Sequence, residues 1–431
     1  MTAMTNSPPG LDFNERLFEL PLDYANPARK TMVFARIVAA SGNENIELPY
    51  MVFFQGGPGS GSPRPFGNTG WIKRVLKEYK LVLLDQRGTG LSTPITAQTM
   101  RGLGSAQAQA DYLKHFRADN IVRDAESIRV RLIGEQQWSI LGQSFGGFCA
   151  MHYLSAAPQG LKEVLITGGI PSLTRPVDDV YRATYRRVID KNRLYYQRYP
   201  ADVEKVRAIV HHLLNHDVRM PSGGHLSARR FLQLGLQFGM SDGIEAIHFL
   251  VEEAFVSGVD GNGKKEINWN FLLHLEQLQS FDTNPIFSLM QEACYTQQAA
   301  SNWSAERLLA EYPEFSLDQA GPVLFTGEMI YRWMFDTYPQ LQPLKHAAER
   351  IAQDDAWPML YDVEKLKLNR VPVAAAVYYD DMYVHREFSE ETARVVPNMK
   401  LWVTNRYQHN GLRADGEAVV DRLLQMVRGE V

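Results

Sequence analysis

The hexapeptide GQSFGG at residues 142–147 constrains the fold of this chain more than any other feature. It follows the apolar run QQWSIL, which is typical of a buried strand, and precedes FCAMHYLSAA, which is typical of a helix. In the pattern Gly-x-Ser-x-Gly, a sharp turn between strand and helix strains the serine backbone, and glycines avoid crowding the neighbouring elements. This context predicts a nucleophilic Ser144. The alternative is a structural turn without a catalytic role.

Strand-like and helical runs alternate along the first 172 residues, and strand-like runs return near the carboxyl end. Alternation of this kind predicts an α/β fold with a mostly parallel, mostly buried sheet. The amphipathic run at 416–429 predicts a closing helix. The runs that predict strands are 31–40, 48–54, 80–85, 138–142, 163–168, 371–381 and 400–405.

The stretch between the two strand-rich parts has a helical pattern. Long runs with helical periodicity occur at 178–199, 201–214 and 243–256, with few strand candidates between them. A chain of 431 residues suits one domain with a large insertion. We therefore predict a first part of the core at 1–172, a helical cap domain at 173–357, and a second part of the core at 358–431.

Composition excludes several classes of function. With 45 Lys and Arg against 49 Asp and Glu, the formal charge is −4, so no basic field attracts nucleic acid or anionic lipid. The amino-terminal segment lacks a signal-peptide pattern, and no window approaches the roughly 18 apolar residues of a membrane span. Two cysteines without CxxC spacing, Cys149 and Cys294, fit a reducing compartment and argue against a cysteine-based zinc site. We expect a soluble cytoplasmic protein that needs no metal, and its oligomeric state stays open.

A second glycine-rich stretch, FFQGGPGSGSP at residues 53–63, completes a strand-like run. A phosphate-binding loop would need Lys and then Ser or Thr after its last glycine, but Ser-Pro follows Gly61. Upstream of a nucleophilic serine, such a loop can instead donate a backbone N–H to the negative oxygen of a tetrahedral intermediate. We expect the N–H groups of Gly57 and Phe145 to form this oxyanion hole.

A nucleophilic serine needs a base that is oriented by a carboxylate, and in α/β hydrolases the chain order is Ser, Asp or Glu, His. Among eleven histidines, His409 follows the last strand-like run, in the loop NRYQHNGLR, and we predict that it is the base. His385 is expected at the surface or at a helix end, and His152 in the core. Asp380 and Asp381 both end the run VPVAAAVYYDD, and position alone does not separate them.

Several motifs together resemble one family. FFQGGPGSG, LVLLDQRGTGLSTP, ILGQSFGGF, VPVAAAVYYDDMYV and RYQHNGLR span nearly the whole chain. They are similar to the prolyl aminopeptidase (proline iminopeptidase) family of α/β hydrolases, in particular to its longer branch with an enlarged helical cap. The resemblance implies a serine peptidase that releases N-terminal proline from short peptides without a cofactor, with Ser144 as nucleophile, His409 as base and Asp381 as acid. Gln55 stands where many relatives have His.

The implied substrate carries a secondary ammonium, which is costly to desolvate without a paired anion. Glu292 in LMQEACYTQ and Glu328 in FTGEMIYRWMF stand among apolar and aromatic residues, so we predict that they bind this amino group. The alternative is an internal ion pair with a cap Arg or Lys. We predict that the wall of the proline pocket is formed by Tyr295, Tyr331 and Trp333. The alternative is that these aromatic residues belong to the core, as such residues more often do.

Two other functions fit the same residues. A carboxylesterase or general α/β hydrolase would use the same triad, because fold and triad do not determine the substrate. A non-catalytic binding protein on this fold is the second alternative, and the intact Ser, Asp and His argue against it. Dehalogenases and epoxide hydrolases of similar fold place Asp rather than Ser at the turn, which disfavours their chemistry here.

Overall fold

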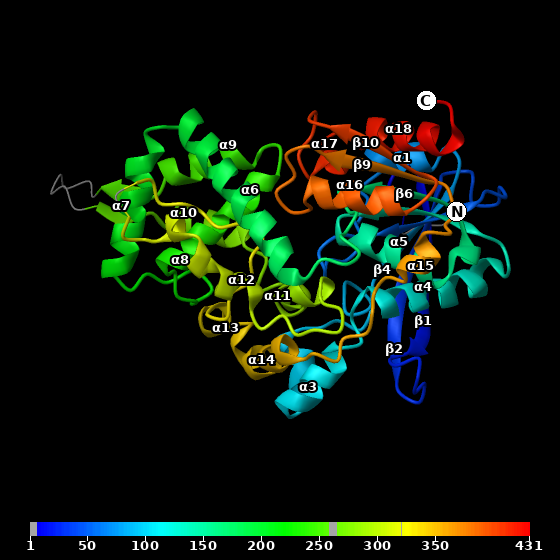
Figure 1. The fold of residues 1–431 in the computed structure, drawn as a ribbon, viewed down its shortest axis with the longest axis horizontal. Coiled ribbons are helices and arrows are strands. Elements are labelled where there is room, and N and C mark those ends of the chain that lie inside the picture. The colour runs from blue at the N-terminus through cyan, green and yellow to red at the C-terminus, as the bar shows by residue number, and fades with distance from the viewer. Residues whose placement is uncertain (1–6, 258–264, 320) are drawn as a thin grey trace, which may run out of the picture.

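The computed structural model describes residues 7–257, 265–319 and 321–431, and an eight-stranded sheet forms its centre (Figure 1). The strand order is β1-β2-β4-β3-β5-β6-β9-β10. The pairs β1–β2 and β2–β4 are antiparallel, and all remaining pairs are parallel. The strands are β1 (Leu11–Pro21), β2 (Lys30–Ala40), β3 (Tyr50–Phe54), β4 (Lys80–Asp85), β5 (Trp138–Gln143), β6 (Leu161–Thr167), β9 (Val373–Tyr378) and β10 (Met399–Thr404).

The central parallel strands are buried on both faces. All six residues of β9 are buried, and because strand side chains alternate between faces, Val373 and Ala375 join one apolar cluster while Ala374 and Ala376 join the other. Helices on either side of the sheet cover these faces, which is why the strands appear in the sequence as continuous apolar runs. The predicted α/β fold with a mostly parallel sheet is confirmed.

Helices pack on both faces of the sheet. In Figure 1, α1 and α18 lie on one side, and α4, α5 and α15 lie on the other. The helices of this half of the molecule are α1 (Gly70–Val75), α2 (Ala97–Arg101), α3 (Ala106–Leu113), α4 (Ala118–Ile133), α5 (Phe145–Ala156), η1 (Pro158–Gly160), α15 (Val363–Leu366), α16 (Arg386–Val395), α17 (Gly411–Ala414) and α18 (Gly416–Arg428).

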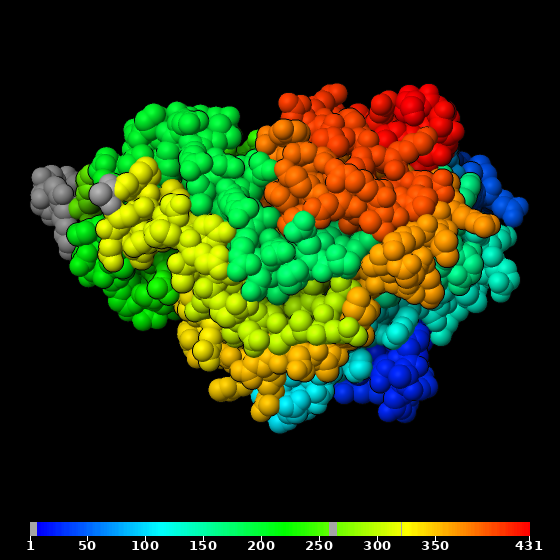
Figure 2. Space-filling view, in the orientation of Figure 1, coloured from blue at the N-terminus to red at the C-terminus, as the bar shows by residue number. Residues whose placement is uncertain are grey.

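Between β6 and β9 the chain forms a mainly helical segment beside the sheet (Figure 1). On the face drawn in Figure 2, its surface runs continuously into that of the sheet half. The domain boundaries at 172/173 and 357/358 stay a prediction. The segment contains α6 (Val177–Arg198), α7 (Asp202–Asn215), α8 (Ala228–Leu232), η2 (Gln233–Gly239), α9 (Gly243–Glu252), β7 (Phe255–Ser257), β8 (Lys265–Ile267), α10 (Trp269–Leu278), α11 (Pro285–Met290), η3 (Glu292–Cys294), α12 (Ser304–Leu308), η4 (Leu309–Glu311), η5 (Pro313–Phe315), α13 (Met334–Thr337), η6 (Gln342–Leu344) and α14 (Lys345–Gln353).

Two local expectations differ from the structure. The helical run expected at 243–256 ends at Glu252, because Phe255 and Val256 pair with β8 in a small antiparallel sheet. Strand β1 has no counterpart among the predicted strands, since the middle of the strand, residues 14–17, is exposed and mostly polar and the strand is held by pairing with β2. Within the described part of the chain, none of the helices has the length and apolar character needed to cross a membrane.

Candidate active site

Ser144 forms the turn between β5 and α5. Its backbone angles, φ 53° and ψ −124°, are rare for a residue with a side chain. The Ser144 N–H donates to the carbonyl of Thr167 on β6 at 2.9 Å, and the Ser144 carbonyl accepts from the Gly147 N–H at 2.7 Å. A side chain at Gly146 would collide with the Phe54 carbonyl on β3, so glycine is required where this strand passes the turn. Neighbouring strands therefore hold the serine at the carboxyl edge of the sheet.

His409 lies in the loop after β10 and faces a buried carboxylate. Its Nδ1 is 2.8 Å from Oδ2 of Asp381, in the turn that follows β9. The other oxygen, Oδ1, accepts the backbone N–H groups of Tyr383 at 2.8 Å and Val384 at 3.1 Å. These bonds fix the direction of the carboxylate, and the carboxylate in turn fixes the imidazole.

The electrostatics of this pair favour a basic imidazole. Burial opposes the charged form of His409, but the Asp381 carboxylate and its hydrogen bond outweigh burial, so the pKa of His409 is raised above its ordinary value. Glu328 acts in the same direction. A raised pKa makes the imidazole a stronger proton acceptor, and the carboxylate stabilises the imidazolium that forms.

Asp380, the neighbouring carboxylate, lies at the surface. Its side chain is 49% exposed and forms an ion pair with Arg187 at 3.4 Å. Asp381 is 2% exposed. The structure thus separates two consecutive aspartates that sequence position left equivalent, and brings only Asp381 to His409.

Ser144 and His409 line one cavity of about 240 Å³, which we call the serine cavity. Its walls come from the loop after β3, from the turn at Ser144, from the helical segment and from the loops after β9 and β10. The lining residues are Gln55, Gly56, Gly57, Ser60, Gln143, Ser144, Leu236, Gln237, Met240, Leu278, Ser280, Asn284, Phe287, Glu328, Tyr383 and His409.

Two backbone N–H groups adjoin the serine. Phe145 is the first residue of α5, and the N–H of a first helical residue has no acceptor within its helix. Gly57 lines the serine cavity with φ 126°. A Cβ on the preceding Gly56 would lie 3.0 Å from the Ser144 Cβ, so the glycine-rich loop is pressed against the turn. Both segments predicted to supply oxyanion donors therefore contact Ser144.

The competing histidines lie outside the serine cavity. Nδ1 of His152 contacts the Leu360 carbonyl, and Nε2 of His385 is 2.8 Å from a Glu387 carboxylate oxygen. Burial lowers the pKa of both imidazoles. In residues 7–257, 265–319 and 321–431, no group of three or more His, Cys, Asp or Glu side chains is arranged to hold a metal ion.

Glu328 reaches the serine cavity from the helical segment. Burial raises the pKa of Glu328 to about 8, the Asp381 carboxylate adds to this shift, and His409 and a hydrogen bond with Gln291 oppose it. A carboxyl group in this state gains from a cation brought into the cavity, because an opposite charge favours its ionised form.

Glu292, the second carboxylate predicted to bind an amino group, lies elsewhere. Its Oε2 accepts the Ser304 N–H at 3.1 Å, and its Oε1 accepts the Ala305 N–H at 3.0 Å. These are orphan amides at the start of α12, and Glu292 is not among the lining residues of the serine cavity. Its position differs from the predicted one because both oxygens are used to cap a helix.

The three predicted wall residues are also dispersed. Tyr295 packs edge-on against Phe148 of α5, with ring centroids 5.6 Å apart, and is not a lining residue of the serine cavity. Tyr331 and Trp333 stack at 5.9 Å and line a different cavity of about 610 Å³. The two cavities share no lining residue. Residues 322–332 form no helix, so spacing along the sequence does not put Glu328 and these rings on one face.

The helical segment holds the histidine loop through contacts that no sequence pattern predicted. The His409 N–H donates to the Gly239 carbonyl at 3.1 Å, and the Tyr383 hydroxyl donates to the Leu236 carbonyl. The Tyr383 ring also packs edge-on against His409, with centroids 4.6 Å apart. The position of Tyr383, two residues after Asp381, could have indicated a role near the site. The residues of η2 carry no sequence motif that would have predicted their contacts with the histidine loop.

The fold and these side chains together define an α/β hydrolase, with a serine on the strand-to-helix turn and a paired Asp and His on later loops. The family described as alpha/beta hydrolase fold matches residues 49–217. Among solved structures, esterase E22 aligns over 96% of this chain and 100% of its own, with a TM-score of 0.49 at 9% sequence identity.

Two proteins of similar sequence indicate a narrower family. A proline iminopeptidase of Aeromonas sobria is 46% identical over 421 residues, which cover 97% of each chain. A proline iminopeptidase of Aspergillus aculeatus is 36% identical over 427 residues, which cover 96% of this chain and 93% of its own. The protein belongs to the proline iminopeptidase family.

Proposed function

We propose that the protein is a serine aminopeptidase that releases N-terminal proline from short peptides. The observation that carries the proposal is the serine cavity, where Ser144, His409 and Glu328 meet. Nucleophile, base and a carboxyl group suited to a cation then surround one small space. The similarity to two proline iminopeptidases over nearly the full chain supports the same activity.

In the proposed reaction, Ser144 Oγ attacks the carbonyl carbon of the proline while His409 takes the hydroxyl proton. The N–H groups of Gly57 and Phe145 stabilise the negative oxygen of the tetrahedral intermediate. His409 then gives its proton to the departing nitrogen as the C–N bond breaks, which leaves a prolyl ester on Ser144. Water, deprotonated by His409, hydrolyses that ester and releases proline. Asp381 orients the imidazole throughout.

Glu328 is assigned to the substrate amino group. The α-amino group of a peptide titrates near pH ~8, close to the pKa of about 8 of Glu328 in the serine cavity. At neutral pH both groups are mostly protonated, so forming the ion pair releases the proton of Glu328, and the attraction between ammonium and carboxylate offsets the cost of taking either charge out of water. A substrate with an acylated amino group offers no cation and leaves this carboxyl group unpaired.

The helical segment is assigned the role of a cap. Residues 173–357 contribute Leu236, Met240 and Glu328 to the serine cavity, whereas residues 1–172 and 358–431 contribute Ser144 and His409. The cavity of about 240 Å³ bordered by this cap is assigned to the proline residue, and the cap to the exclusion of residues upstream of the proline. Both cysteines are free and buried, which fits the reducing cytoplasm as its compartment.

The test compares wild type with Ser144→Ala on four substrates: prolyl, alanyl and N-acetylprolyl p-nitroanilides, and p-nitrophenyl acetate. Free prolyl anilide is the expected substrate, and Ser144→Ala is expected to reduce its turnover by about 10³-fold or more. Ser155→Ala is the matched control, since Ser155 lies on the same helix but bonds the His152 carbonyl. Ester cleavage without prolyl preference would indicate a general hydrolase, and no Ser144-dependent turnover would indicate a binding protein.

A further inference from the structure

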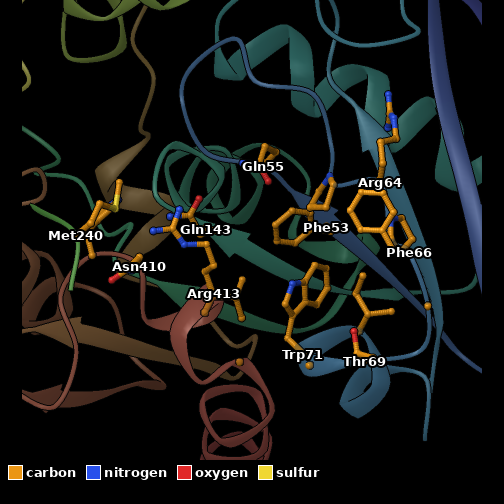
Figure 3. Close-up of a pocket in the computed structure, with 18 residues that line it drawn as sticks. Phe53, Gln55, Arg64, Phe66, Thr69, Trp71, Gln143, Met240, Asn410 and Arg413 are labelled. Carbon is orange, nitrogen blue, oxygen red and sulfur yellow. The ribbon is translucent and has the colours of Figure 1, made fainter. Parts of the chain in front are cut away.

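A second cavity, of about 540 Å³, adjoins the serine cavity (Figure 3). The two share four lining residues, which are Gln55, Gln143, Met240 and His409. The remaining walls of this outer cavity come from Phe53, residues 63–72 and residues 410–416. No step of the proposed mechanism uses this space, although His409 faces both cavities.

The chemistry of His409 decides which part of a substrate the outer cavity receives. Because His409 protonates the departing nitrogen, the residue that follows the proline must lie beside the imidazole. Glu328 lines the serine cavity and not the outer one, so the amino group and the proline belong in the serine cavity. The next residue then extends past His409 into the outer cavity.

One side of the outer cavity is aromatic. Phe53 and Trp71 pack with ring centroids 4.6 Å apart, and Phe66 lies beside them in Figure 3. Phe66 is 93% exposed, so almost its entire ring is available for contact. An aromatic or large apolar side chain placed there would remove apolar surface of both partners from water.

The opposite side is cationic. In Figure 3 the Arg413 side chain extends toward Gln143, across the cavity from the aromatic rings. Arg413 is 66% exposed, and its carboxylate neighbour Asp242 is 76% exposed at 3.5 Å, which makes a weak ion pair. Arg64, the other cation of the wall, is held by the fully buried Asp85. Arg413 is therefore the cation that can exchange its partner for a carboxylate of a ligand.

We propose that the outer cavity binds the residue that follows the proline and that Arg413 binds the terminal carboxylate of that residue. The preferred substrates are then dipeptides of proline and an aromatic or large apolar amino acid. This inference rests on the proposed function, and it adds the identity of the leaving group. The aromatic side of the cavity selects the side chain, and the cationic side limits the length of the peptide.

The carboxylate contact is tested by comparing kcat/KM for Pro-Phe, Pro-Phe amide and prolyl p-nitroanilide. For an exposed ion pair, we expect wild type to prefer Pro-Phe over its amide by about fivefold. Arg413→Gln is expected to remove this preference while the amide and the anilide change by less than about twofold. Arg219→Gln is the matched control, because Arg219 is 59% exposed and pairs with Asp217 away from both cavities.

The aromatic contact is tested with Phe66→Ala and with the pair Pro-Phe and Pro-Gly. The variant is expected to lower the preference for Pro-Phe by about threefold or more, since apolar contact area is lost. The exposure of Phe66 keeps the fold unaffected. Equal rates for acid and amide in wild type, or unchanged preferences in both variants, would overturn the inference. If prolyl anilide itself is not cleaved, the proposed function fails instead.

Discussion

Two glutamates of the helical segment have similar surroundings in the sequence and different ones in space. Glu292 is 8% exposed, and both its oxygens accept backbone N–H groups of α12. Glu328 borders the serine cavity, and burial there raises its pKa to about 8. One carboxylate completes a helix end, while the other faces a space large enough for a ligand.

The two side chains differ in a feature that separates a structural carboxylate from a functional one. Burial raises the pKa of Glu292 as well, so a raised pKa alone does not identify a site. The distinguishing feature is the partner: backbone donors satisfy Glu292, whereas Glu328 lies within the electrostatic reach of His409 and Asp381 in a cavity. Three predictions test this difference.

The largest expected effect is on activity in Glu328→Gln. Because the variant keeps the size of the side chain but cannot pair with an ammonium, kcat/KM for prolyl p-nitroanilide should fall by about 100-fold. Hydrolysis of p-nitrophenyl acetate, which has no amino group, should change by less than about threefold. An equal loss on both substrates would show that Glu328 supports the triad rather than the amino group.

An intermediate effect is expected on stability in Glu292→Gln. The amide supplies one acceptor oxygen where the carboxylate supplied two, so one buried N–H of α12 loses its partner at a cost of about 1–3 kcal/mol. Urea unfolding at pH 7 measures the change. Activity on prolyl p-nitroanilide should stay within about threefold of wild type, and a selective loss of activity would contradict the structural assignment.

The third expected effect is a dependence of stability on pH. The pKa of Glu328 is about 8 in the folded protein, above its ordinary value of 4.5, so the folded state retains this proton while the unfolded chain releases it. Wild type therefore loses stability relative to Glu328→Gln as pH rises from about 4.5 to about 8.

Unfolding free energies of both proteins at pH 5 and pH 9 give the measurement. We expect the variant to gain about 4 kcal/mol on wild type between these two pH values, since about three units separate pH 5 from the pKa of about 8 and each unit corresponds to about 1.36 kcal/mol. Glu292→Gln is measured in parallel as the control for a carboxylate with bonded partners. A constant difference between wild type and Glu328→Gln would refute the raised pKa.

The parts of the fold that were predictable share a local physical cause. Strands β3, β4 and β9 are buried on both faces, so their sequences are almost entirely apolar. The turn at Ser144 was predictable because only glycine fits beside the crossing β3. Strand β1 escaped prediction because it is stabilised by its pairing with β2, and its exposed face carries ordinary polar residues.

The residues of the candidate site also divide into those that local sequence predicted and those that it did not. Chain order and loop position led to His409, whereas Asp381 was chosen over Asp380 only through the family resemblance, and the structure places Asp381 2.8 Å from His409. The environment of Glu328 and Glu292 was not predictable, because it depends on where residues 322–332 and α12 lie relative to the sheet. The aromatic residues near Glu328 were predicted to line the proline pocket. Because the chain there is irregular, Tyr331 lines another cavity instead.

The α/β fold, the strained turn at Ser144 and the position of His409 after the last strand were predictable from the amino-acid sequence. These features depend on short segments of the chain, namely the glycines of the turn, the apolar strands and the loop that contains His409, so a local sequence pattern can predict them. Which carboxylates lie beside His409 and in the serine cavity depends on the tertiary structure. That choice depends on the packing of the helical segment on the sheet edge, where hydrogen bonds to Gly239 and Leu236 link residues far apart in the chain.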